Sequence, residues 1–349
     1  MGGKIGVRHY FIEGLTARGY ISLLPILMTD WRPLYIVGGG PGSGKSTFIK
    51  SIGLELLDRG YEVDFFRSAL DPDALAGFVI PGMGLCMLNQ LEVKPIHWRA
   101  PGIIERFVDL SPLADEGKIK QFRKEIIDIS KRLVVLQNQV EKDLIMTYSA
   151  AQDKPWRKKS YPYSLNDDLF EQGVDGLSWQ GESAGPWPQV KNIVKKLQKG
   201  KITPCFLHGI NPGGWVNLAP HFLADCDQIR LEGEDKLDAL NWVLNEAQQL
   251  GQVMNIVLHP LNPDEVVGIV FPERNLAIWQ GRPGELDQQN IDEPVKGTVK
   301  ETLTAWYNQR SLLKRFYTES MDFKQADNLR EQILNRILCE LTDIEEGNA

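Results

Sequence analysis

The stretch LYIVGGGPGSGKSTFIKSI, residues 34–52, decides how the rest of this chain is interpreted. Its centre, GGPGSGKS at residues 39–46, fits the pattern G-x-x-x-x-G-K-[ST] in full. A short apolar run precedes the glycines, and a segment with apolar residues on one helical face follows them. A strand, a glycine-rich loop and a helix in this order predict a loop whose backbone N–H groups surround phosphate oxygens.

Each residue type in this loop meets a physical requirement. Glycines adopt backbone conformations that other residues avoid, so successive N–H groups can turn towards a phosphate. The ammonium group of Lys45 would contact the terminal phosphates of a nucleotide, and the hydroxyl of Ser46 would bind Mg²⁺. ATP and Mg²⁺ are the expected ligands, although the loop does not read the base and GTP stays an alternative. The predicted binding residues are Gly39, Gly40, Pro41, Gly42, Ser43, Gly44, Lys45, Ser46 and Thr47.

The segments on either side of the loop occur twice. FIEGLTARGYISL at residues 11–23 aligns with FLHGINPGGWVNL at residues 206–218. LDPDALAGFVIPGMGLCML at residues 70–88 aligns without a gap with LNPDEVVGIVFPERNLAIW at residues 261–279. Two matching blocks in the same order indicate a duplicated plan. Because predicted strands and helices alternate in each half, we expect an α/β fold of two parallel sheets covered by helices.

The second half does not repeat the loop itself. The same alignment places RLEGEDKL, residues 230–237, opposite the phosphate loop, and only Gly233 and Lys236 keep its residue types. Three carboxylates there would repel phosphate groups: Glu232, Glu234 and Asp235. We therefore expect nucleotide binding in the first half alone.

Three regions follow from these patterns. Residues 1–150 form a phosphate-loop domain that ends in a long helix, 151–203 form a connector, and 204–349 form a degenerate repeat with C-terminal helices. Apolar residues at three- and four-residue steps predict the helix over 114–150 and the helices near the C-terminus. Their apolar stripes either pack within the chain or form a short coiled coil with a second copy or a protein partner.

The acids of a hydrolytic site do not follow the usual pattern. Nucleotide hydrolases commonly end a strand with an acid that holds magnesium, whereas here GLCML runs into Asn89. Asp71 and Asp73 follow the second predicted strand, at the edge where parallel sheets bind ligands. Asp73 recurs as Asp264, which favours a role in a turn. Asp71 becomes Asn262 in the second half and is therefore the better candidate for a general base.

Several cations are candidates for phosphate contacts, with a solvated surface charge as the alternative for each. His97 is interpreted as structural. The candidates are Lys94, Arg99 and Arg106 in the first half, and Arg274 or Arg282 donated by the second.

A metal site is a competing interpretation of the second half. Cys205, His208, His221 and Cys226 form C-x2-H-x12-H-x4-C, which is close to zinc-ligand spacing. We favour a structural role because the first two residues lie in a repeated strand, where neighbouring side chains point to opposite faces. The four cysteines form no CxxC pair, so free thiols in a reducing compartment are expected.

Composition narrows the class of protein. Hydrophobic residues make up 42% of the chain and charged residues 24%, which is typical of a folded chain with a sizeable core. The formal net charge of −7 argues against a broad basic surface for nucleic acid. The N-terminus has no apolar signal segment and no run has membrane-spanning length, so a cytoplasmic location is expected.

Four motifs together resemble a family of bacterial tandem P-loop proteins that are assigned by similarity as ATPases or nucleotide kinases: HYFIEGLTARGYISL, LYIVGGGPGSGKST, LDPDALAGFVIP and APGIIERFVDL. The resemblance implies an ATP site at residues 39–47. It also matches Asp71 to a position of the family pattern whose role is not settled. Family members carry a phosphate loop in both halves and Asp-Gly-Thr-Ala-Pro-His after the third strand. Here NQLEVK, residues 89–94, stands at that place, so Asn89 replaces the acid and Lys94 the histidine.

Three functions remain after this comparison. The first is slow ATP hydrolysis coupled to a conformational change, with Lys45 and Asp71 as the predicted catalytic residues. The second is a nucleotide-sensing regulatory or scaffold protein without significant turnover. The third is a kinase acting on a nucleotide or small molecule, since GGPGSGK resembles the loop of nucleoside-monophosphate kinases, although no arginine-rich lid is evident.

Overall fold

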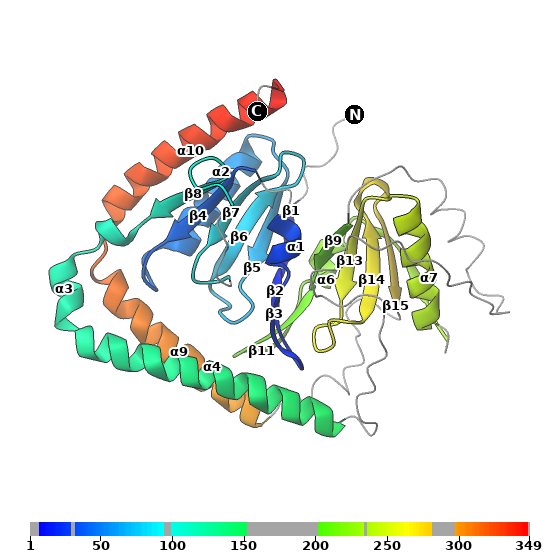
Figure 1. The fold of residues 1–349 in the computed structure, drawn as a ribbon, viewed down its shortest axis with the longest axis horizontal. Coiled ribbons are helices and arrows are strands. Elements are labelled where there is room, and N and C mark those ends of the chain that lie inside the picture. The colour runs from blue at the N-terminus through cyan, green and yellow to red at the C-terminus, as the bar shows by residue number, and fades with distance from the viewer. Residues whose placement is uncertain are drawn as a thin grey trace.

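Two large sheets lie side by side, and long helices border the first of them (Figure 1). The computed structural model describes residues 7–28, 32–93, 99–151, 202–233, 236–280 and 297–347. The first sheet has the order β1-β5-β6-β7-β4-β8 and the second β12-β15-β14-β13-β9.

The strands of the first sheet are β1 (Val7–Tyr10), β4 (Leu34–Gly38), β5 (Val63–Arg67), β6 (Leu75–Ile80), β7 (Leu85–Asn89) and β8 (Glu105–Asp109). Those of the second are β9 (Ile202–Cys205), β12 (Asp227–Leu231), β13 (Met254–Leu258), β14 (Val266–Phe271) and β15 (Leu276–Gln280). Read from its β9 edge, the second sheet repeats the first as far as β4, both in strand order and in relative direction. The described part of the second half has no counterpart of β8.

The expectation of parallel sheets is wrong in one respect. In each sheet one strand, β6 or β14, runs antiparallel to both of its neighbours, so the sheets are mixed. The reason is the length of the connections. Residues 68–74 and 81–84 are too few for the crossover of a dozen or more residues that joins parallel neighbours, so these strands form hairpins.

Smaller elements repeat as well. The hairpin of β2 (Glu13–Thr16) and β3 (Gly19–Ser22) precedes α1 (Leu24–Leu27), and the hairpin of β10 (His208–Asn211) and β11 (Gly214–Asn217) precedes α6 (Ala219–Phe222). The amphipathic helices α2 (Lys45–Asp58) and α7 (Lys236–Gln249) each pack against their own sheet. The repeated sequence segments therefore form equivalent hairpins and helices in the two halves.

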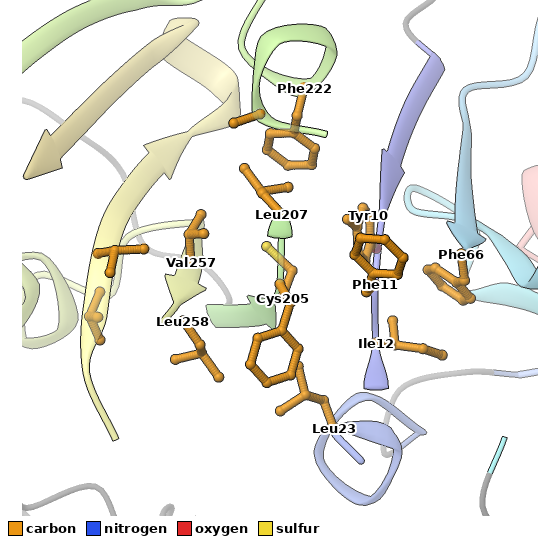
Figure 2. Packing of buried hydrophobic residues seen from close by; sticks show 14 of the residues in the cluster. Tyr10, Phe11, Ile12, Leu23, Phe66, Cys205, Leu207, Phe222, Val257 and Leu258 are labelled. Atoms are coloured by element: carbon orange, nitrogen blue, oxygen red, sulfur yellow. The ribbon is translucent and has the colours of Figure 1, made fainter. Parts of the chain in front are cut away.

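The two halves meet at a pair of matched phenylalanines. Phe11 and Phe206 exchange two backbone hydrogen bonds of 2.9 Å, which makes the contact reciprocal. A side chain on Gly209 would place its Cβ 3.2 Å from the Phe11 ring, and one on Gly14 would lie 3.5 Å from the Phe206 ring. Figure 2 shows Phe11, Leu207 and their neighbours from both halves in one shared core. The halves are thus related by an approximate two-fold axis through this contact.

The helices that follow the second sheet return to the first. The short helix α3 (Glu116–Gln121) and the long helix α4 (Arg123–Ala151) follow the first sheet, and the long helices α9 (Thr298–Thr318) and α10 (Phe323–Glu345) follow the second. Ile337 and Leu341 of α10 are fully buried in the core between α2 and the first sheet. Glu340 accepts a hydrogen bond from Tyr35 at 2.7 Å and pairs with Arg106 at 2.6 Å. α9 lies along α4 (Figure 1), while Val135 on α4 stays exposed, so a partner on that face remains an alternative.

Two negative findings concern the described residues only. No group of three or more His, Cys, Asp or Glu side chains is placed to hold a metal ion, so the zinc pattern gains no support. The helices include none that is long and apolar enough to cross a bilayer. The four cysteines are free, as expected.

The turn after β5 and its counterpart after β13 are held by equivalent bonds. The backbone N–H of Asp71 donates to Ser68 Oγ at 3.1 Å, and that of Asn262 donates to His259 Nδ1 at 3.0 Å. His259 Nδ1 also accepts from the backbone N–H of Leu261 at 3.2 Å. Burial lowers the pKa of His259 from 6.5 to about 4, because the charged ring would lose its hydration.

His259→Asn is expected to make the protein less sensitive to acid. The unfolded chain takes up the histidine proton first, so the free energy of unfolding of the native protein falls as the pH drops from 6.5 towards 4. At pH 5 this loss is about 2 kcal/mol. Asparagine keeps an acceptor for the two N–H groups but does not titrate. Urea unfolding at pH 7.5 and pH 5 measures the difference, and an equal loss in both proteins would contradict this account.

Candidate functional site

The glycine-rich loop connects β4 to α2 and has the geometry of a backbone cradle. Its glycines Gly39, Gly42 and Gly44 have φ values of 136°, 81° and 88°, which other residues rarely adopt. α2 begins at Lys45, so the positive end of the helix dipole faces the loop. This confirms the strand–loop–helix context that was expected from the sequence.

Lys45 holds the loop together from inside. Its Nζ donates to the carbonyl oxygens of Gly39 at 2.9 Å and Gly40 at 2.6 Å, and to Ser43 Oγ at 3.2 Å. Burial, opposed by the charge of Glu92 and assisted by the charges of Arg310 and Lys314, lowers the pKa of Lys45 to about 8. An anion in the loop would relieve this repulsion among cations.

Ser46 and Asn89 meet at the carboxyl end of β7. Asn89 Nδ2 lies 3.3 Å from Ser46 Oγ and also donates to the Leu75 carbonyl at 3.1 Å. The backbone N–H of Leu75 donates to Ser46 Oγ at 3.2 Å. Asn89 therefore occupies the place next to the loop hydroxyl where an acid would help to hold Mg²⁺, and it brings no charge there.

Helix α9 adds two cations to this site that the sequence did not single out. Arg310 Nε donates to Asp71 Oδ2 at 2.9 Å, and Arg310 also pairs with Glu92. Lys314 Nζ lies 2.5 Å from the same Asp71 oxygen. Burial alone would raise the pKa of Asp71, but the charges of Lys314 and Arg310 bring it below its ordinary value.

Asp71 is consequently close to the loop but turned away from solvent. It is completely buried, and its other oxygen accepts from the backbone N–H of Asp73 at 3.2 Å. Asp73 rather than Asp71 lines the cavity beside the loop, and its carboxylate accepts a hydrogen bond of 2.5 Å from Tyr307 of α9. In this arrangement Asp71 is an ion-pair partner of α9.

The loop glycines also make room for α9. A Cβ on Gly42 would lie 2.2 Å from the Lys314 carbonyl oxygen, and one on Gly40 would lie 2.2 Å from the Tyr317 ring. Thr318 Oγ1 donates to the Gly42 carbonyl at 3.0 Å. Gly42 is thus required by α9 as well as by the loop conformation, whereas Gly40 is required by α9.

A cavity of about 260 Å³ lies between the loop and α9. It is lined by Lys45 and Ser46 from the loop, by Asn89, and by Arg310 and Lys314 from α9. A second cavity of about 310 Å³ shares Leu91, Glu92 and Arg310 with it. The first volume, about 260 Å³, lies just below the usual range for a small-molecule site.

No protein-family model, curated protein or solved structure matches this chain.

The other predicted cations that the structure describes do not line the cavity beside the loop. Arg99 pairs with buried Glu105 at 2.8 Å and donates to the Met28 carbonyl, so it holds a loop in place. Arg106 binds Glu340 of α10. The residues that line the cavity do not include Arg274. Lys94, His97, Arg282, Glu234 and Asp235 lie outside the described residues.

Sequence reasoning missed the contribution of α9 because the contacts are remote. The bond between Arg310 and Asp71 joins residues 239 positions apart. On a helix, a basic pair four residues apart also has the ordinary appearance of a solvated face. A usable signal was the apolar stripe of α9, since it predicted a packed helix with one buried face.

Gly42→Ala is expected to destabilise the protein more than Gly102→Ala does. Both glycines have a φ of 81°, but a Cβ on Gly102 meets nothing within 4 Å, whereas one on Gly42 collides with the α9 backbone. Both variants carry the same backbone strain, but only Gly42→Ala adds the collision. We expect the collision to lower the free energy of unfolding by about 1–3 kcal/mol more. Urea unfolding without nucleotide measures the difference, and equal midpoints would show that α9 does not rest on the loop.

Proposed function

We propose that this chain binds a nucleoside triphosphate with Mg²⁺ at residues 39–47 and hydrolyses it slowly. The observation that carries the proposal is the loop itself, with positive φ at Gly39, Gly42 and Gly44 and with Lys45 beginning the helix. Backbone N–H groups at a helix start, a buried lysine and a hydroxyl are the donors that phosphate groups require.

The charges around the cavity support a phosphate ligand. Among the described residues, Lys45, Arg310 and Lys314 bring three positive charges to its lining, against the carboxylates of Asp73 and Glu92. Buried Asp71 also pairs with both cations of α9, so a polyanion would be attracted here by taking over these pairs. We also propose that the two halves are duplicated P-loop-like units, one with its loop intact and one without.

Mg²⁺ would arrive with the phosphates. The described acids form no site that could hold a metal ion alone, which agrees with the preference of this ion for substrate phosphates and one or two protein ligands. Ser46 is the residue that would contact it, while Mg²⁺ would neutralise charge on the phosphate oxygens. The neutral amide of Asn89 beside Ser46 gives weaker support for the ion, and this is the reason to expect slow turnover.

Two other functions each have one observation in their favour. A sensor without turnover is favoured by the ion pairs that occupy Asp71, the candidate base. A phosphotransferase is favoured by the second cavity, because it adjoins the first at Glu92 and Arg310 and has room for an acceptor. A compound that raises ADP formation above the basal rate would identify the phosphotransferase.

Lys45→Ala is expected to weaken Mg-ATP binding by about 10- to 100-fold, because charge-assisted bonds to phosphate oxygens are lost. Lys50→Ala removes an exposed lysine from the same helix and is the matched control, with unchanged affinity. Isothermal titration calorimetry with Mg-ATP measures both. Equal affinity of the two variants would refute nucleotide binding by the loop.

Asn89→Asp is expected to raise Mg-dependent phosphate release by about tenfold or more, since a carboxylate beside Ser46 would hold the ion more firmly. Gln280→Glu is its matched control in the second half, where Gln280 Nε2 donates to the Val266 carbonyl at 2.6 Å. Both changes place a carboxylate against a backbone carbonyl, so both should destabilise the fold. Only Asn89→Asp should accelerate hydrolysis, and equal rates would favour the sensor.

A further inference from the structure

A cluster of buried charges joins α9 to the first sheet. Asp71 is completely buried, and the side chains of Arg310, Glu92 and Lys314 are 11%, 7% and 26% exposed. Buried ion pairs often add little net stability, because desolvation of the charges offsets their attraction. A cluster of this kind beside the phosphate loop therefore suggests a role other than holding the fold.

The two cations are placed to act on a ligand. Arg310 and Lys314 are four residues apart on α9 and so lie on one face of the helix. The cavity that they line is also lined by Lys45 and Ser46. The effect of both charges on the pKa of Lys45 shows that the three cations share one electrostatic environment. An anion among them would contact the loop on one side and α9 on the other.

We propose that Arg310 and Lys314 bind the terminal phosphate of a nucleoside triphosphate, exchanging Asp71 and Glu92 for phosphate oxygens. This inference rests on nucleotide binding by the loop. A diphosphate lacks the third phosphate, so it leaves the ion pairs of α9 intact. Helix α9 therefore distinguishes a triphosphate from a diphosphate.

The chemistry of the groups favours this exchange. A planar guanidinium binds phosphate oxygens through two parallel hydrogen bonds, and an ammonium contributes a mobile point charge. The terminal phosphate carries more negative charge than one carboxylate and would be held by Lys45 at the same time. After the exchange, Asp71 loses the cations that keep its pKa low and becomes able to accept a proton.

The first experiment compares affinities for the Mg complexes of AMPPNP and ADP by calorimetry. The native protein is expected to prefer AMPPNP by about tenfold or more. In Lys314→Met this preference should fall to about twofold, with ADP affinity nearly unchanged. Arg315→Ala, which removes the exposed neighbouring cation on α9, is the control and should keep the full preference.

A second variant guards against misfolding. Lys314→Met leaves Asp71 with fewer partners, whereas the double variant Lys314→Met/Asp71→Asn removes one charge of each sign. The double variant should lose the preference for AMPPNP in the same way. If either folded variant keeps the native preference, or if both lose affinity for the two nucleotides equally, the inference is wrong.

Tryptophan fluorescence gives an independent measurement. The Arg310 guanidinium lies 5.2 Å from the centre of the Trp306 ring, and it would leave that ring in the exchange. AMPPNP should therefore change the emission of the native protein more than ADP does, and Trp306→Phe should remove this difference. Equal responses to the two nucleotides would contradict the exchange. Failure of the native protein to bind either nucleotide would instead refute the proposed function.

Discussion

The pair of backbone hydrogen bonds between Phe11 and Phe206 sets the position of the second sheet relative to the first. Each ring lies over a glycine of the opposite half, and the approach is tighter at Gly209, where a Cβ would come within 3.2 Å of the Phe11 ring, than at Gly14. The hairpin of the first half also reaches the second through an ion pair between Arg18 and Asp264. With the halves held in this way, the chain that leaves the second sheet returns as α9 and α10 to the first.

The internal repeat separates positions that maintain the fold from positions that serve the site. Asn89 and Gln280, at matched positions of the two halves, both donate an amide N–H to a strand carbonyl. Ser68 and His259 both accept a backbone N–H in equivalent turns of the two halves. These bonds survive a change of residue type because the backbone still needs them. By contrast, the acid of Asp71 becomes an amide in Asn262, in the half that lacks the glycine-rich loop. At this position, unlike at Asp73 and Asp264, the charge is found only in the half with the intact loop.

Local features of the fold were readable from the sequence. The glycine-rich loop, the helix that follows it and the repeated hairpins depend on residues that are neighbours in the chain. The direction of β6 was predicted wrongly, although the four residues 81–84 that follow it are too few for a parallel crossover. The pairing of Asp71 with Arg310 could not be predicted, because a helical pattern gives the buried face of α9 but not the surface that this face meets. From the sequence, α9 was placed in the second half only because α9 follows the second repeat in the chain.

The contact between Thr318 and Gly42 spans 276 positions, so the helix that covers the loop is made long after the loop itself. At translation rates of about 5–20 residues per second, α9 follows the loop after tens of seconds. Throughout that interval Asp71 and Glu92 have no cations from α9, and the space kept free by Gly40 and Gly42 is unfilled. The glycine-rich loop of a growing chain is therefore open on the side that the finished protein closes, and this side is covered only after α9 has been made.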